Sequence, residues 1–269
     1  MNLASDCLIL PMPYQAKPLH YKRFFRSATA PSFESFDKND TILAWIDILG
    51  VQRMNHQTIK SVVKDALEVA AECSSVGPIV SLGGPPNCDV LIGTPQSVAQ
   101  YTLVGDALLL VEKDSPETQA AATLGFIDRV CLASRILNEL GYPHKGIITR
   151  GSVYCDRIDD TSLITGSGVV KAYHLESNLN AAGLFYDESL EPFLSQRSNQ
   201  IRRNNWYEPF AGLNWNFGAN APNLSGVIFS QFSGWELWKS AIANGNHQFP
   251  KISNSAALIQ DLQSMRNLP

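Results

Sequence analysis

The sequence is poor in charge, and the charge that it carries is almost balanced. Charged residues make up 17% of the 269 residues, and 21 Lys and Arg stand against 25 Asp and Glu, for a formal net charge of -4. Sequence-independent binding to DNA needs a concentrated basic surface that displaces counterions from the phosphates. The small acidic excess therefore argues against a nucleic-acid partner.

Long apolar runs and paired cysteines are missing as well. No stretch approaches the roughly 18 consecutive apolar residues of a membrane-spanning helix, and no basic segment precedes an apolar run near residue 1, as in a signal peptide. The five cysteines are far apart and form no Cys-x-x-Cys pair, which disfavours a disulfide framework and a zinc site. We therefore expect a cytoplasmic protein without membrane contact, in which Cys73 and Cys131 are small core residues.

Hydrophobic residues make up 45% of the chain, enough for a substantial core, and their distribution suggests one domain with two extensions. Residues 1–40 contain four prolines and are predicted to form an irregular arm with a basic, aromatic stretch at 20–26. Residues 41–190 carry regular patterns and form the domain. Residues 191–269 hold four of the five tryptophans and are expected to pack on that domain, with helices near 234–244 and 253–266.

Between residues 41 and 190 the patterns predict the order β-α-β-β-α-β-α-β. Residues 41–50 are almost continuously apolar, which is typical of a central strand covered on both faces. Helices are expected at 57–73, from 115 to 141 and from 166 onward, and further strands at 101–104, 107–112, 145–154 and 184–186. Residues 74–99 are predicted to be loops with one short strand at 89–92. Two helices on one face of a mainly antiparallel sheet give an α+β fold.

Two aspartates stand out by their context. Asp47 interrupts the apolar strand, and a buried carboxylate is costly unless it is paired, hydrogen-bonded or bound to a metal. Asp106 follows Gly105 in a tight turn between two predicted strands. Both acids could reach one point, where two carboxylates and phosphate oxygens suit Mg²⁺ or Mn²⁺. The alternative is a turn aspartate and a structurally satisfied buried aspartate.

Four segments resemble, in the same order, the motifs of class III nucleotidyl cyclases. Ala-Trp-Ile-Asp-Ile-Leu-Gly at 44–50 resembles the first metal-binding strand, and Tyr-Thr-Leu-Val-Gly-Asp-Ala at 101–107 resembles the metal-binding hairpin. Residues 146–153 are similar to the strand that follows, and residues 166–176 to the next helix. The resemblance covers about residues 41–190. It implies a mainly antiparallel sheet with helices packed on it, around a ferredoxin-like core.

The departures from the family pattern concern the residues that bind the base and the transition state. Val170 stands where the family has Asn, His174 stands where it has Arg, and Gln100 and Thr102 replace the Lys or Glu that select a purine. The short, single-domain form, the Arg150-Gly151 segment and the ending Ala-Tyr-His-Leu-Glu at 172–176 most resemble the bacterial pyrimidine cyclases of Pycsar anti-phage systems. The resemblance implies conversion of UTP, or else CTP, into a cyclic nucleotide that activates a separate cyclic-nucleotide-binding effector.

The resemblance also implies a two-metal site and a homodimer with two symmetric sites. Two Mn²⁺ or Mg²⁺ ions would be held by Asp47, Asp106 and the backbone carbonyl of Ile48. Residues expected to contact the nucleotide lie in the turn after Asp47 and on the strand before Asp106: Ile48, Leu49, Gly50, Val51, Gln100 and Thr102. Cations that could stabilise the leaving pyrophosphate come from the strand, the helix and the arm: Arg150, Lys171, His174, Lys22, Arg23 and Arg26.

Other interpretations remain open from the sequence. Arg150 could instead pair structurally with Asp106 or Glu176, while Lys171 and His174 could be ordinary surface residues of a helix. A catalytically degenerate homologue that binds nucleotide and signals by dimerising would fit the missing Asn and Arg. The retained Asp47 and Asp106 favour catalysis. A purine cyclase with unusual base contacts is a third possibility.

Overall fold

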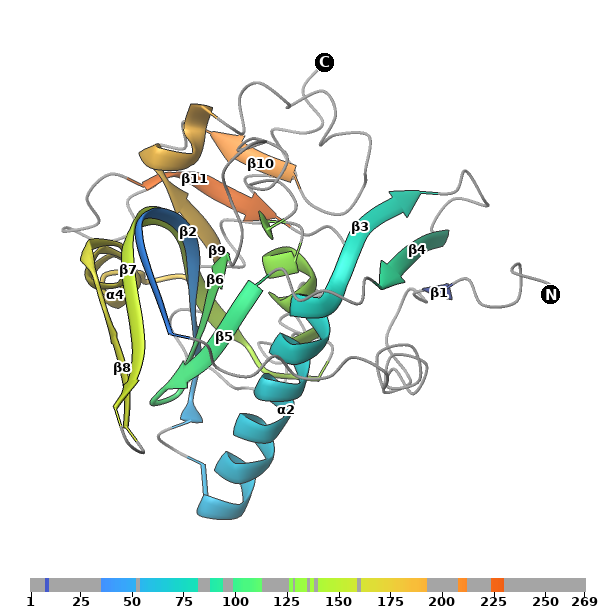
Figure 1. The fold of residues 1–269 in the computed structure, drawn as a ribbon. Coiled ribbons are helices and arrows are strands. Elements are labelled where there is room, and N and C mark those ends of the chain that lie inside the picture. Colours follow the sequence, from blue (N-terminus) through green and yellow to red (C-terminus); the bar gives the residue numbers. More distant parts are fainter. Residues whose placement is uncertain are drawn as a thin grey trace.

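The computed structural model describes residues 8–9, 35–51, 54–81, 88–93, 99–112, 126–127, 129–134, 136–137, 140–158, 161–192, 208–211 and 224–229. Within these ranges the fold is built on one large sheet whose strands run in the order β10-β11-β9-β7-β2-β6-β5, with β8 paired to β7 (Figure 1). Of its pairings only β7 with β9 is parallel. The predicted mainly antiparallel α+β fold is confirmed.

The strands of the large sheet are short except for the two at its centre. Their bounds are β2 (Phe36–Ile48), β5 (Ala99–Val104), β6 (Ala107–Glu112), β7 (His144–Ile158), β8 (Thr161–Thr165), β9 (Gly183–Asp187), β10 (Glu208–Ala211) and β11 (Leu224–Phe229). A separate three-stranded sheet contains β1 (Leu8–Ile9), β4 (Cys88–Gly93) and β3 (Val76–Ser81), in that order. The described helices are α2 (His56–Ser75), α4 (Ser167–Ser177), the short 3-10 helix η3 (Glu188–Leu190) and a helical stretch within 126–137.

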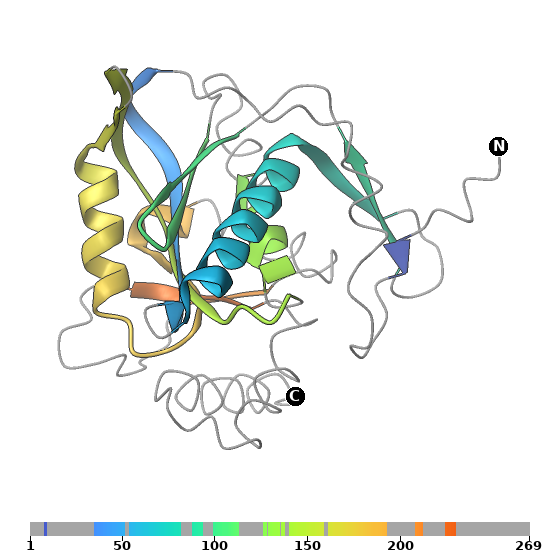
Figure 2. The ribbon, with the colours of Figure 1, turned by 90° about the horizontal axis from the view of Figure 1, so that it is seen from below.

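Strand β2 lies between β7 and β6, and from Thr41 to Ile48 it is buried on both faces apart from the half-buried Asp47, which explains the continuous apolar sequence of this part. Its even-numbered residues, such as Ile42 and Ile46, join a core cluster with α2 and with the helical stretch 126–137. Its odd-numbered residues, such as Leu43 and Trp45, join a second cluster with α4. The sheet therefore has helices on both faces, and Figure 2 shows α2 and α4 on opposite sides of it. Cys73 and Cys131 are buried in the first cluster, as predicted.

Helix α4 packs unusually closely on β7, and glycines make this approach possible. A Cβ atom built on Gly151 would lie 2.6 Å from both the Cα and the N atom of Gly168. Gly166, just before the helix, has a positive φ of 129°, and a Cβ there would lie 2.2 Å from the carbonyl oxygen of Ser152. The glycines of the predicted helix start therefore set the distance between α4 and the sheet.

Several elements differ from the sequence prediction. Strand β2 begins at Phe36 rather than at residue 41, and β3 occupies residues that were expected to be loop. Gly77 and Pro78 of this strand lie at a register shift between Val76 and Ile79, where a strand tolerates proline. Strand β8 was not predicted, and β10 and β11 of the tail add two strands to the edge of the large sheet. The helices predicted at 234–244 and 253–266 and the basic stretch 20–26 lie outside the described residues.

Candidate active site

The two predicted acids lie at neighbouring strand ends. Asp47 pairs with Ala107, the first residue of β6, and Asp106 is the residue before it. Gly105 and Asp106 form the two-residue turn of the β5–β6 hairpin, because Val104 pairs with Ala107 and Gly105 has a positive φ of 67°. The N–H of Ile48 donates to the carbonyl oxygen of Asp106 at 3.5 Å. The structure thus brings Asp47 and Asp106 to adjoining positions, as the sequence suggested.

Asp47 is half-buried, and its carboxylate faces a lysine that the sequence analysis had not considered. Lys145 pairs with Asp47 across β2 and β7, and its Nζ lies 3.8 Å from Asp47 Oδ2. The same ammonium contacts the carboxylate of Glu176 and donates to the Glu176 backbone carbonyl at 3.1 Å. Glu176 is at the C-terminal end of α4, so the three charged groups come from three different elements.

The donor set at this point suits a hard divalent cation that is shared with a phosphate ligand. No group of three His, Cys, Asp or Glu side chains gathers within the described ranges, so these residues offer no all-protein metal cage. Mg²⁺ is normally held by one or two carboxylates together with substrate phosphates. Asp47 and Asp106, with the backbone carbonyl of Ile48, supply that number and type of oxygen ligands. These residues fit Mg²⁺ or Mn²⁺ in the company of a triphosphate.

The turn after β2 is anchored by its side chains and partly open in its backbone. Leu49 and Val51 are buried, and the Leu49 N–H donates to the carbonyl of Pro143 at 2.8 Å. The Val51 carbonyl accepts from Met54, while Gly50 takes a positive φ of 85°. The N–H of Gly50 has no bonded acceptor in the described part of the chain, and the N–H of Val51 follows it in the same turn. These two N–H groups are the candidate phosphate donors of the turn.

The two predicted base-contacting residues lie on β5, at the edge of the sheet. Gln100 pairs with Val111, and Thr102 pairs with Leu109. Leu109 belongs to the core cluster on the α4 side of the sheet, the side to which the odd-numbered residues of β2, including Asp47, also point. Directly opposed residues of paired strands share a face. The structure therefore keeps Thr102 and Asp47 on one face of the sheet.

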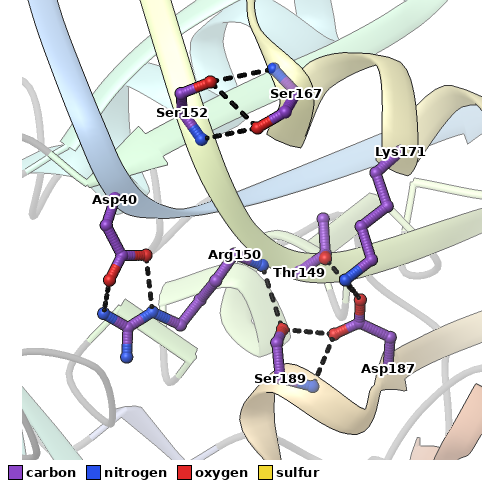
Figure 3. Close-up of polar contacts among 8 residues, drawn as sticks. All are labelled: Asp40, Thr149, Arg150, Ser152, Ser167, Lys171, Asp187 and Ser189. Atoms are coloured by element: carbon purple, nitrogen blue, oxygen red, sulfur yellow. Dashed lines mark hydrogen bonds and ion pairs between the residues drawn. The ribbon is translucent and has the colours of Figure 1, made fainter.

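The structure does not bring Arg150 to the acids. Arg150 pairs with Ile42, five residues along β2 from Asp47, a separation of about 17 Å. Its side chain lies on the opposite face, where Nε and Nη2 donate to the two carboxylate oxygens of Asp40 at 3.2 and 2.7 Å (Figure 3). The structural partner of Arg150 is therefore Asp40, and neither Asp106 nor Glu176.

Lys171, five residues before Glu176 on α4, is held by a buried acid. Its ammonium contacts Asp187 at the end of β9, a residue that is 1% exposed. Thr149 donates to the same carboxylate at 2.6 Å, and the Ser189 N–H donates at 3.1 Å, as Figure 3 shows. Asp187 lies beyond Tyr186, which pairs with Ile148, so this polar cluster is about 13 Å along β7 from Lys145. Lys171 is thus tied away from Asp47.

His174 is an exposed residue of α4. Its ring lies edge-on to Tyr173 with the centroids 5.8 Å apart, and its backbone carbonyl accepts from Ser177 and Asn178. Tyr173 in turn packs edge-on against Trp45, at a centroid distance of 6.0 Å. Val170, the other departure from the family pattern, is 51% exposed. Both unusual positions of α4 therefore face outward.

Lys145 and Glu176 are the site residues that sequence reasoning missed. The sequence did contain a hint of both residues. Lys145 is a charged residue at the start of an apolar strand, and Glu176 is an acid at the end of a helix whose apolar residues face inward. Recognising their contact required the register between β2 and β7, which no local pattern gives.

A neighbouring histidine is buried and uncharged. His144 pairs with Ile48 and is 0% exposed. Its Nδ1–H donates to the Tyr142 carbonyl at 3.0 Å, which leaves Nε2 to accept the Ser134 hydroxyl at 2.6 Å. Burial lowers the pKa of His144 to about 4. Because it has no access to solvent, this Ser–His pair supports the strand end rather than reacting with a substrate.

Comparison with known proteins gives structural likeness only. No protein-family model matches the chain, and no curated protein is significantly similar to it. The adenylyl cyclase CyaB from P. aeruginosa is 11% identical over 74% of this chain and 97% of its own, with a TM-score of 0.48. The guanylate cyclase domain of RhGC from Catenaria anguillulae, solved with GTP, is 10% identical over 74% and 99%, with a TM-score of 0.43. Such values assign neither a family nor a function.

In the described residues, no helix combines the length and the hydropathy needed to cross a membrane.

Proposed function

We propose that the protein is a nucleotide cyclase that converts a pyrimidine nucleoside triphosphate, UTP before CTP, into its 3′,5′-cyclic monophosphate. The observation that carries the proposal is the position of Asp47 and Asp106 at neighbouring strand ends, joined by the bond from Ile48 N–H to the Asp106 carbonyl. The two residues occupy the positions that the cyclase-like motifs give to metal ligands. If the two aspartates only stabilised the fold, they would not need to lie beside each other.

The reaction is an intramolecular displacement at the α-phosphorus. The ribose 3′-oxygen forms a bond to the α-phosphorus, the bond from that phosphorus to the bridging oxygen breaks, and pyrophosphate leaves with the bonding electron pair. The proton of the 3′-hydroxyl passes to solvent. When bound, two divalent cations supply positive charge that acidifies the 3′-hydroxyl and neutralises the triphosphate. Asp47, Asp106 and the Ile48 carbonyl would hold them, and Gly50 and Val51 would donate N–H groups to phosphate oxygens.

The proposed preference for a pyrimidine rests on β5. Gln100 and Thr102 are neutral and can both donate and accept hydrogen bonds, in positions where purine-specific relatives in the resembled family carry a charge. Thr102 shares the face of Asp47, which supports its role beside a bound nucleotide. In this proposal the cyclic product acts as a second messenger in anti-phage defence, on a separate cyclic-nucleotide-binding effector in the cytoplasm.

We further propose that the active form is a homodimer. The outward face of α4 carries Val170 and Tyr173, three residues apart and each more than half exposed, and Leu163 of the adjacent β8 is 41% exposed. A second chain would cover these side chains. It could also supply a cation for the leaving pyrophosphate, since Arg150 and Lys171 are engaged elsewhere and Lys145, the cation beside Asp47, is paired with Glu176.

A second function is favoured by one observation. Arg150 and Lys171 are both paired with acids away from Asp47, and His174 points outward, so no predicted cation among the described residues faces the acids. A protein that binds nucleotide without cyclising it, and signals by dimerising, would need no such cation. This candidate predicts saturable nucleotide binding and no cyclic product.

The deciding experiment incubates the purified chain with each of the four nucleoside triphosphates and Mn²⁺, and identifies the products by chromatography. Cyclic UMP or cyclic CMP supports the proposal. Saturable binding without any product rejects it in favour of the second function.

Variants of the acids test the site itself. Asp47→Asn and Asp106→Asn should each lower kcat at least about 100-fold, because each removes an anionic oxygen ligand. Asp37→Asn, an exposed aspartate ten positions earlier on β2, is the matched control and should retain activity. Substantial activity in either site variant would refute the metal assignment.

A further inference from the structure

Lys145 is a buried cation that touches two acids unequally. It is 4% exposed, and its ammonium contacts Glu176, which is 5% exposed, while it stays 3.8 Å from Asp47 Oδ2. It also donates to the Glu176 carbonyl at 3.1 Å, at the C-terminal end of α4. A lysine that neutralised Asp47 alone would sit against Asp47. The observed position instead leaves Glu176 to balance the lysine charge.

This arrangement has a consequence for Asp47. Because Glu176 balances the charge of Lys145, the carboxylate of Asp47 is left to balance a bound cation, while the ammonium attracts one of its two oxygens. That attraction limits the rotation of the Asp47 side chain. Groups that orient a metal ligand in this way affect metal affinity or activity by about 10- to 100-fold when they are removed.

We propose that Lys145 and Glu176 are positioning residues that set the orientation and charge of Asp47 for divalent cation binding. This inference rests on the proposed metal-dependent function of Asp47 and names two residues that the cyclase-like motifs do not assign. Lys145 fixes Asp47 from β7, and Glu176, supplied by α4, prevents the lysine from competing with the cation for Asp47.

A purely structural role is a weaker explanation of the pair. A buried ion pair can often be replaced by apolar residues without loss of stability. The same face of the sheet already offers an apolar environment, since Leu175, Leu179 and Ala181 belong to its core cluster. The fold itself therefore gives no reason for two buried charges beside Asp47.

The test measures Mn²⁺ binding to the full chain without nucleotide, by the electron paramagnetic resonance signal of the free ion, together with cyclic nucleotide formation. Glu176→Gln keeps the shape and removes the compensating charge. Lys145→Met with Glu176→Leu removes the pair but leaves no buried charge unpaired. Asp47→Asn provides the reference for loss of the ligand. The matched control is Lys64→Met with Glu68→Leu, an exposed ion pair of 3.7 Å on α2.

We expect Glu176→Gln and the Lys145/Glu176 double variant each to weaken Mn²⁺ binding about 10- to 100-fold, and the α2 control to bind as the unaltered chain does. Circular dichroism establishes that each variant is folded, and Glu176→Gln decides the question if the double variant does not fold. Unchanged Mn²⁺ affinity in Glu176→Gln, or Mn²⁺ binding that does not depend on Asp47, would overturn the inference.

The two readouts separate this inference from the cyclase proposal. If the unaltered chain forms no cyclic nucleotide but Mn²⁺ binding weakens as expected, the positioning role stands and the cyclase fails. If cyclic nucleotide is formed while the variants bind Mn²⁺ normally, the cyclase stands and the positioning role fails.

Discussion

The buried neutral His144 should make the protein lose stability in mildly acidic solution. In the folded state burial holds the pKa of His144 at about 4, whereas the unfolded chain has the ordinary value of about 6.5. Between these two pH values the histidine is protonated in the unfolded state and neutral in the folded state. The stability contributed by the neutral ring is therefore complete above about pH 6.5 and is lost as the pH falls toward 4.

The size of the effect follows from the two pKa values. The difference of about 2.5 units corresponds to about 3 kcal/mol once the pH is below both values, at about 1.4 kcal/mol per unit. At about pH 5 the unfolded histidine is almost fully protonated and the folded one is mostly neutral. Lowering the pH from about 7.5 to 5 should therefore cost about 2 kcal/mol from this residue alone.

Urea denaturation at the two pH values measures this loss. His144→Gln removes the titrating ring but can still accept the Ser134 hydroxyl, so its free energy of unfolding should fall by about 2 kcal/mol less than that of the unaltered chain over the same pH range. His56→Gln, at the exposed start of α2, is the control and should behave as the unaltered chain does. If His144→Gln retained the full pH dependence, the account of a buried neutral histidine would be refuted.

Three further outcomes follow from the packing and charges. Gly166→Ala should lower the free energy of unfolding by about 2 kcal/mol or more, measured by urea denaturation, since its Cβ would meet the Ser152 carbonyl; an unchanged value would contradict the close packing of α4. Lys171→Met should cost about 1–2 kcal/mol by thermal unfolding, because Asp187 stays buried while the lysine is partly exposed, and a stabilised variant would speak against this ion pair. Cys155, whose thiol pKa burial raises to about 11, should resist alkylation in the native protein and react after unfolding; rapid native labelling would show that it is accessible.

Much of the site could be read from local sequence. An acid inside an apolar run and a Gly-Asp turn between two strand patterns were enough to predict that Asp47 and Asp106 come together, because both patterns depend on neighbouring residues only. The start of α4, expected at residue 166, was predicted for the same reason. The β5–β6 hairpin was predicted close to its observed ends, whereas β2 begins five residues earlier than predicted.

The parts that the sequence could not supply depend on register and on distant partners. Arg150 is five residues from Lys145 on a regular strand, so the two side chains lie on opposite faces, but only the pairing with β2 shows which face holds Asp47. Strands β10 and β11 were missed because both are short and depend on distant pairing: β10 pairs with β11, and β11 pairs with β9, more than thirty residues earlier in the sequence. Lys145 was missed because its partners belong to β2 and α4.

Our proposal is that Asp47 and Asp106 form the metal-dependent centre of a pyrimidine nucleotide cyclase. It is tested most directly by giving the chain an equimolar mixture of all four nucleoside triphosphates with Mn²⁺ and identifying the products by mass spectrometry, beside the Asp47→Asn and Asp106→Asn variants. We predict cyclic UMP or cyclic CMP with one pyrophosphate per product molecule, and product formation at least about 100-fold slower with either variant. Recovery of all four triphosphates unchanged, or a cyclic purine nucleotide as the main product, would contradict it.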